Sequence, residues 1–151
     1  MSMRVLFVCL GNICRSPAAE GIFRHIAPDH ATDSAGTSDW HIGDAPYPLM
    51  QAEMQNRGYN ISDLRARQFT AADFTDFDLL IAMDADNITN MEQLRPTNNT
   101  TPLRLFTYFA DTGDAFVPDP YYTGDYPGAL TLIENAAHGL SHHLANQRTP
   151  S

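Results

Sequence analysis

The stretch VCLGNICRSP, Val8 to Pro17, places two cysteines, a glycine, an asparagine and an arginine close together. Cys9 ends an apolar run and precedes a helix-like run, whose free N–H groups and dipole favour a thiolate. Arg15 can return over the same cavity and bind two oxygens of an anion through its planar guanidinium. A cysteine, five residues and an arginine therefore suit a phosphate-sized tetrahedral anion held over a thiolate nucleophile.

The residues between Cys9 and Arg15 favour an anion-binding loop. Gly11 permits close backbone approach and a positive φ, and Asn12 tolerates a left-handed conformation. Successive N–H groups can then point inward and form a nest for an anion. We expect the substrate phosphate to be surrounded by Leu10, Gly11, Asn12, Ile13, Cys14 and Ser16.

Other uses of the two cysteines fit this segment less well. Two ordinary semi-buried cysteines in a turn would not account for the Gly-Asn pair between them or for the Ser-Pro that follows. A metal clip would need a second pair of ligands nearby, and the neighbouring sequence supplies none. A thioredoxin-type redox pair has two residues between its cysteines, whereas four separate Cys9 from Cys14.

A thiolate that cleaves a phosphate ester also needs an acid to protonate the leaving oxygen. The segment VPDPYY holds Asp119 between two prolines, which stiffen the backbone. Tyr121 and Tyr122 follow as aromatic walls for a flat substrate ring. Asp-Pro is also a common turn dipeptide, and alone it would indicate only a turn. Together with the opening motif it makes Asp119 the expected acid.

Strand-like and helix-like runs alternate along the chain. Apolar, β-branched runs predict strands at 4–8, 31–36, 77–83 and 102–106. Helices are predicted at 17–27, with Ser16 as its cap, at 49–58, at 85–94 and, after a long loop from 108 to about 126, near the C-terminus. This last helix has a core-facing stripe of Leu130, Ile133, Ala137, Leu140 and Leu144. The alternation predicts a three-layer α/β fold, a four-stranded parallel sheet with helices on both faces, and ligands beyond the carboxyl ends of the strands.

Composition limits the remaining possibilities. The 151 residues fit one domain, 1–151, and the 43% of hydrophobic residues favour a packed core. With 9 basic and 18 acidic residues the net charge is −9, which disfavours nucleic acids and anionic membranes as partners. The sequence shows neither a signal-peptide pattern nor an apolar span of ~20 residues. We therefore expect a soluble, cytoplasmic monomer.

VCLGNICRSP together with DPYY resembles the low-molecular-weight protein tyrosine phosphatases. SAGTSDWH, ARQFT and FDLLIAMD occur in the family's order, so the resemblance covers nearly the whole chain. It implies that Cys9 forms a phosphocysteine, that Arg15 binds phosphate and stabilises the transition state, and that Asp119 acts as acid and then as base. It also implies tyrosine-phosphorylated protein substrates, inorganic phosphate as product, and no metal or organic cofactor.

The resemblance assigns supporting roles as well. Asn12 and Ser16 would hold the loop, with Ser34 as a partner of Asn12, and Cys14 could trap oxidised Cys9 as a disulfide. The expected rim residues are Trp40, His41, Tyr121 and Tyr122. For Trp40, an ordinary partly buried tryptophan is the competing interpretation.

Two segments depart from the family pattern. Leu64 stands where many members have a histidine, and Tyr47–Met50 replaces a common Asp-Pro-Arg-Ala. The first departure concerns a residue that would support the phosphate loop, and the second concerns recognition of the substrate at the protein surface. Neither changes the nucleophile, the loop or the acid.

Alternative activities remain open at this point. A related arsenate reductase would relay a disulfide through cysteines after Cys14, and this chain has none there. A related phosphoarginine phosphatase would have threonine in place of Ile13, whose apolar bulk favours an aromatic ester. A phosphate-binding module without catalysis would not need Asp119. His138 and His142 lie four apart, but without an evident third ligand they indicate a solvated helix face.

Overall fold

The computed structural model describes residues 2–147, so Met1 and residues 148–151 of the expected domain lie outside the described residues. The described part contains no helix that is both long and apolar enough to span a bilayer. The elements, in chain order, are β1 Arg4–Cys9, α1 Arg15–Ile26, β2 Ala31–Gly36, α2 Pro48–Asn56, α3 Asp73–Asp76, β3 Leu79–Ala82, α4 Ala85–Glu92, β4 Leu103–Leu105, the 3-10 helix η1 Phe106–Phe109, α5 Pro120–Thr123 and α6 Tyr126–Gln147.

The four strands form one parallel sheet in the order β2-β1-β3-β4, which confirms the predicted fold. β1 is central and pairs with β2 along its whole length, from Arg4 to Cys9. β3 and β4 are shorter than predicted. β4 ends early because the chain enters the 3-10 helix η1 at Phe106, so the apolar run 102–106 is divided between a strand and a helical turn.

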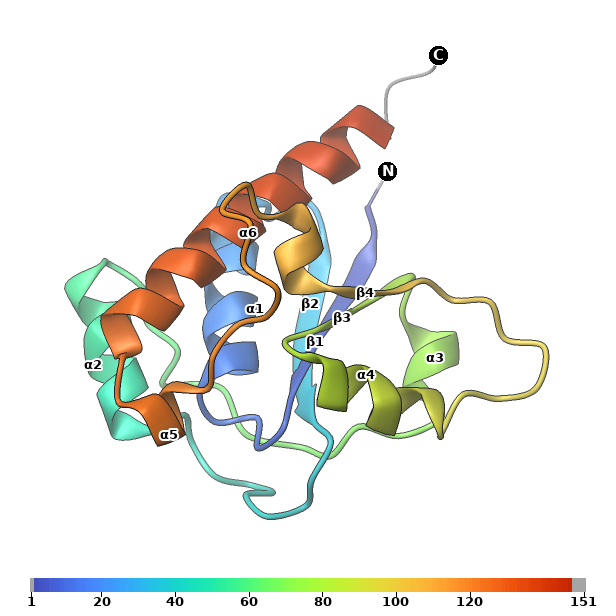
Figure 1. The fold of residues 1–151 in the computed structure, drawn as a ribbon, viewed down its shortest axis with the longest axis horizontal. Coiled ribbons are helices and arrows are strands. Elements are labelled where there is room, and N and C mark those ends of the chain that lie inside the picture. Colours follow the sequence, from blue (N-terminus) through green and yellow to red (C-terminus); the bar gives the residue numbers. More distant parts are fainter. Residues whose placement is uncertain (1, 148–151) are drawn as a thin grey trace.

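Helices cover both faces of the sheet (Figure 1), with α1, α2 and α6 on one side and α3 and α4 on the other. β1 contributes to both cores because alternate side chains of a strand point to opposite faces. Val5 and Phe7 join the larger core beneath α1 and α6, whereas Leu6 and Val8 join the smaller one. All five residues of the predicted stripe on the last helix are buried in the larger core: Leu130, Ile133, Ala137, Leu140 and Leu144.

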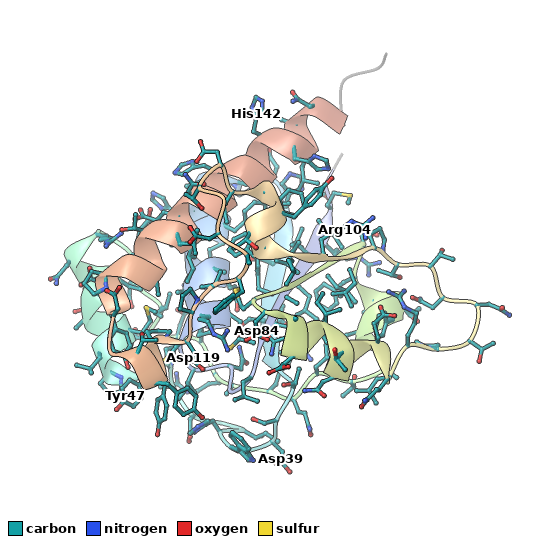
Figure 2. The ribbon with its side chains drawn as sticks, viewed as in Figure 1. Asp39, Tyr47, Asp84, Arg104, Asp119 and His142 are labelled. Carbon is teal, nitrogen blue, oxygen red and sulfur yellow. The ribbon has the colours of Figure 1, made fainter. Side chains whose placement is uncertain are left out.

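The strand order changes direction at β1, because the chain passes to β2 on one side and later to β3 on the other. Loops that leave neighbouring parallel strands on either side of such a point open a crevice between them. Cys9 is the last residue of β1, and Asp84 follows β3 closely. Asp84, Asp119 and Tyr47 all lie at this end of the molecule, and His142 lies at the opposite end (Figure 2).

Some local predictions were wrong. α1 begins at Arg15, and Ser16 does not cap it, because its hydroxyl is engaged with Cys9. The expected long loop contains α5, a four-residue helix capped by the Asp119 side chain. α3 and η1 were also missed, since helices of four residues are too short to show an apolar periodicity.

Candidate active site

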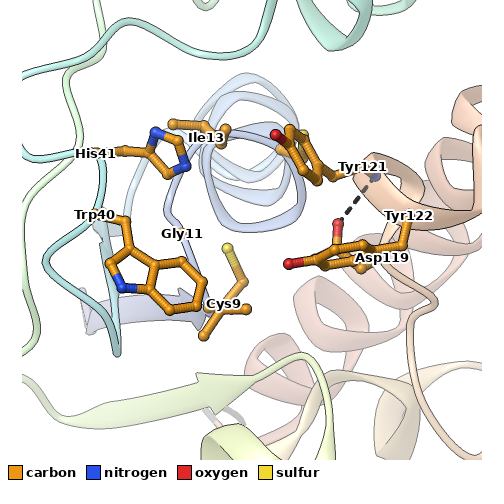
Figure 3. A pocket seen from close by; sticks show the side chains of 10 residues that line it. Cys9, Gly11, Ile13, Trp40, His41, Asp119, Tyr121 and Tyr122 are labelled. Carbon is orange, nitrogen blue, oxygen red and sulfur yellow. Dashed lines mark hydrogen bonds between the residues drawn. The ribbon is translucent and has the colours of Figure 1, made fainter.

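A pocket opens beyond the carboxyl end of β1, with Cys9 at its floor (Figure 3). Trp40 and His41 stand on one side of Cys9, and Tyr121 and Tyr122 stand on the other. The predicted site residues Asn12, Arg15 and Ser16 lie behind this surface and are almost completely buried. The residues that line the pocket are Cys9, Leu10, Gly11, Ile13, Cys14, Trp40, His41, Asp119, Tyr121 and Tyr122.

The Cys9 sulfur receives polar contacts from the loop that follows it. The backbone N–H of Asn12 donates to Sγ at 3.2 Å, and the Ser16 hydroxyl lies 3.0 Å from Sγ. Hydrogen-bond donors around the sulfur stabilise the negative charge that it carries as a nucleophile and as a leaving group.

Asn12 fixes the shape of the loop. It adopts φ 57°, the left-handed conformation predicted for it. Its Nδ2 donates to the hydroxyls of Ser16, at 2.8 Å, and Ser34, at 3.0 Å, while its Oδ1 accepts the N–H of Arg67 at 3.0 Å. The Ser16 hydroxyl also lies 3.4 Å from the Ala35 carbonyl oxygen, and when Cys9 is a thiolate this hydroxyl is the donor of the 3.0 Å contact with sulfur. The structure thus brings together Asn12, Ser16 and Ser34 as the sequence predicted.

The chain of hydrogen bonds ends at a carboxyl group that was not predicted as part of the site. Ser34 donates to Glu20 Oε1 at 2.7 Å, and Glu20 is only 7% exposed. Burial raises the pKa of Glu20 to about 7, although the Ser34 hydrogen bond acts in the opposite direction. The sequence offered one indication of this role: Glu20 is an acidic residue at a position of the first helix that is expected to be buried, and unpaired carboxylates are seldom buried.

Two glycines allow the close packing of the loop. Gly11 does not have the positive φ that we expected at this position; Asn12 supplies it instead. The absent Cβ of Gly11 matters for another reason, because it would lie 3.1 Å from the ring of His41. Gly36, at the end of β2, was missed: a Cβ there would approach the carbonyl oxygen of Leu10 to 2.9 Å.

Arg15 is held from behind the pocket. One terminal nitrogen donates to Asp84 Oδ2 at 2.7 Å and to the Val117 carbonyl at 3.0 Å, and the other donates to Asp119 Oδ2 at 3.3 Å. Burial alone would lower the pKa of Arg15, but Cys9, Asp84 and Asp119 together raise it above its usual range. The guanidinium therefore stays charged although the residue is 2% exposed.

Asp84 was not predicted as a site residue. Its Oδ1 accepts the Asn87 N–H at 2.9 Å and so caps α4, while its Oδ2 binds Arg15. Two features of the sequence could have identified it. It follows the buried strand next to β1, and Asn87 three residues later completes a capping box.

Asp119 faces the cavity from the N-terminus of α5. Its Oδ1 accepts the Tyr121 N–H at 3.1 Å, which fixes the carboxyl group at the start of this helix. The prolines on either side restrict the backbone, as predicted from the sequence. Asp119 thus reaches the same cavity as Cys9 from a segment 110 residues away in the chain.

The rim of the pocket is aromatic and exposed. Trp40 is 65% exposed, so the interpretation of an ordinary partly buried tryptophan is wrong. Tyr121 and Tyr122 are exposed as well, and their rings meet edge to face. His41 lies 3.2 Å from Asp44 through Nδ1. These side chains can contact a flat group that stands above Cys9.

The second loop cysteine has a different environment. Cys14 is a free, buried thiol, and burial, with the nearby charges of Cys9 and Asp119, raises its pKa. The nearby Tyr126 hydroxyl acts in the opposite direction on this pKa. Since thiolates rather than thiols are nucleophiles, Cys14 is poorly suited to attack. Of the two cysteines, Cys9 has the environment of a nucleophile.

The remaining candidates lie outside the pocket. Leu64 packs against the larger core, and the backbone of Arg67 occupies the Asn12 oxygen instead of a histidine. His138 and His142 are exposed on α6. Within residues 2–147 no group of three or more His, Cys, Asp or Glu side chains is arranged to hold a metal ion.

Comparisons with known proteins agree with this geometry. The family model "Low molecular weight phosphotyrosine protein phosphatase" matches residues 4–149. The low molecular weight protein-tyrosine-phosphatase YfkJ of Bacillus subtilis is 43% identical over 90% of this chain and 92% of its own length. A fission yeast relative, a low molecular weight phosphotyrosine protein phosphatase of Schizosaccharomyces pombe, is 39% identical over 82% of this chain and 83% of its own.

Solved structures give the same result. The crystal structure of Bacillus subtilis YfkJ superposes with a TM-score of 0.93 at 38% identity, over 99% of this chain and 98% of that one. The structure of a protein tyrosine phosphatase from Entamoeba histolytica, with Hepes in its active site, gives a TM-score of 0.89 at 34% identity, over 98% of this chain and all of that one. The chain belongs to the low molecular weight phosphotyrosine protein phosphatase family.

Proposed function

We propose that this protein hydrolyses phosphotyrosine in protein substrates, and small aryl phosphates, through a phosphocysteine on Cys9. One observation carries the proposal. The Cys9 sulfur and the carboxyl group of Asp119 line one pocket with aromatic walls, and the buried guanidinium of Arg15 lies behind that pocket in contact with Asp119. A nucleophile, a phosphate ligand and an acid are the three groups that cleavage of a phosphate ester requires.

In the first step Cys9 Sγ attacks phosphorus, and the bond between phosphorus and the tyrosine oxygen breaks. Asp119 donates a proton to the leaving phenolic oxygen. In this proposal the Arg15 nitrogen that contacts Asp119 turns toward two phosphate oxygens, while the other nitrogen stays on Asp84 and the Val117 carbonyl. The loop N–H groups and the charge of Arg15 stabilise the negative charge on the equatorial oxygens.

In the second step a water molecule attacks the phosphocysteine. Asp119, now deprotonated, accepts a proton from this water, and the bond between sulfur and phosphorus breaks. Cys9 leaves as a thiolate, stabilised by hydrogen bonds from Asn12 N–H and the Ser16 hydroxyl. Inorganic phosphate is the product, and no metal or organic cofactor takes part.

The proposal is tested with peptides of one sequence that contain phosphotyrosine, phosphoserine or phosphoarginine. We expect phosphate release from the phosphotyrosine peptide to exceed that from the other two, because a flat ring can contact both aromatic walls. Acid quenching during turnover of a radiolabelled substrate should trap the label on Cys9. A preference for phosphoarginine, or turnover without a labelled Cys9, would contradict the proposal.

A further inference from the structure

Tyr47 occupies an unusual place for a tyrosine. It is the N-cap residue of α2, a position where Asn, Asp, Ser and Thr are preferred because their short side chains accept a hydrogen bond from the first turn. The Tyr47 side chain makes no such bond. The ring therefore contributes nothing to the capping of this helix, and its packing elsewhere has to account for its placement.

The ring belongs to a group of four tyrosines, which we call the tyrosine cluster: Tyr47, Tyr121, Tyr122 and Tyr126. Tyr47 meets the edge of Tyr121 at a centroid distance of 5.3 Å and stacks on Tyr126 at 6.3 Å, with planes 9° apart. Tyr121 in turn meets Tyr122 at 5.2 Å. Tyr126 is buried at the start of α6, so the cluster leads from the core to the rim of the pocket.

Tyr121 depends on such support. It is 48% exposed on a helix of four residues, and an exposed side chain on so short an element exchanges between rotamers unless a neighbour restricts it. In the described part of the chain, Tyr121 makes ring contacts with Tyr47 and Tyr122, and Tyr122 is itself exposed. Tyr47 is therefore the contact that connects Tyr121 to a buried residue.

Tyr47 also contacts the phosphate loop through its backbone. Its N–H donates to the Ile13 carbonyl at 2.8 Å, and Ile13 lines the pocket. One residue outside the pocket thus touches a residue of the loop and a residue of the aromatic wall. A change in its ring alters the wall while leaving the backbone bond to the loop in place.

We propose that Tyr47 is a positioning residue that fixes the Tyr121 wall and so increases the affinity of the pocket for aromatic over alkyl phosphate groups. The inference rests on the proposed function, because it assumes that the substrate ring lies against Tyr121. A wall held in one rotamer contacts an aromatic ring without first losing side-chain entropy. The contribution expected for one aromatic contact corresponds to about a three- to tenfold change in affinity.

The test compares Tyr47→Asn with Tyr47→Phe. Asn removes the ring and supplies a preferred N-cap, whereas Phe retains the ring. Inhibition constants and calorimetric dissociation constants are measured for benzylphosphonate and methylphosphonate, which share the phosphonate and differ in the ring. We expect Tyr47→Asn to weaken benzylphosphonate about three- to tenfold and to leave methylphosphonate within about twofold. Tyr47→Phe should bind both like the wild type. In Tyr47→Asn, KM for an aryl phosphate should rise while kcat is preserved.

Equal weakening of the two phosphonates, or no change in a folded Tyr47→Asn, would overturn the inference. Thermal unfolding separates recognition from stability, because the new cap offsets part of the packing lost with the ring and a cooperative transition above the assay temperature shows that Tyr47→Asn is folded when its binding is measured. Should this variant fail to fold, Tyr47→Leu, apolar but without a ring, decides by the same two constants. A wild type that binds both phosphonates yet hydrolyses no aryl phosphate would refute the proposed function, while the binding constants would still decide the role of Tyr47.

Discussion

The phosphate loop and the aromatic rim are built in opposite ways although both contact the same pocket. The loop is buried, and Asn12, Ser16, Ser34 and Glu20 fix it through an unbroken chain of hydrogen bonds. The rim is exposed and is held by ring contacts, which are weaker and less directional. Phosphate has one shape, so its site can be rigid. The surroundings of a phosphotyrosine differ between proteins, and the exposed rim side chains other than the Tyr121 wall can adjust to them.

The largest effect should follow from changing the loop at its centre. Cys9→Ser removes the thiolate, and we expect turnover of an aryl phosphate to fall by at least ~10⁴-fold, because a serine hydroxyl is a weak nucleophile and Asp119 has to serve as the acid in that step. Binding of inorganic phosphate, measured by calorimetry, should persist, since Arg15 and the loop are unchanged. Full turnover by Cys9→Ser would refute the mechanism.

Asp119 lies between the two regions and should show an effect that depends on the leaving group. For phenyl phosphate we expect Asp119→Asn to lower kcat about 10²- to 10³-fold, and for p-nitrophenyl phosphate by less than about tenfold, because nitrophenolate leaves without a proton. Steady-state kinetics with both substrates measure the difference. Equal losses for the two would mean that Asp119 is not the acid.

Glu20 beneath the loop should make stability depend on pH. Its pKa rises from 4.5 to about 7 on folding, so between these values the native state binds more protons than the unfolded state, and stability falls as pH rises through this window. Gln does not titrate, so Glu20→Gln lacks this pH dependence. The unfolding free energy of Glu20→Gln minus that of the wild type should therefore be about 3 kcal/mol larger above pH 7 than below pH 4.5. Denaturant titrations at several pH values test this, and parallel pH dependences would contradict it.

The smallest effect is expected at the rim. Trp40→Ala should raise KM for an aryl phosphate about three- to tenfold with kcat nearly unchanged, because one exposed aromatic contact is worth ~1 kcal/mol. Trp40→Phe, which keeps a ring, should lie between the two. A large loss of kcat in Trp40→Ala would show that the rim affects catalysis by the phosphate loop, and would contradict the separation of the two regions into catalysis and substrate binding.

The sequence by itself determined the order of the elements and the nucleophilic motif, because both depend on neighbours in the chain. An apolar strand, Cys9 at its end, Asn12 with a left-handed backbone and Arg15 at a helix start are local features. The strands and the buried face of α6 follow from the spacing of apolar residues, which repeats every two residues in a strand and every three to four in a helix. Asp119 was inferred from its flanking prolines only in combination with the opening motif.

Only the tertiary structure decided how the loop is supported and what surrounds the pocket. Asp84 reaches Arg15 because the parallel sheet brings the ends of β1 and β3 together, and Glu20 reaches Ser34 because α1 packs on β2. A linear pattern does not specify such pairings. The same limit hid the role of Ser16, whose hydroxyl faces Cys9 instead of capping its helix. Tyr47 appeared in the sequence as a departure from a family pattern. Its ring acquires a role only where α2, α5 and α6 meet, because ring contacts between distant segments exist only once the chain has folded.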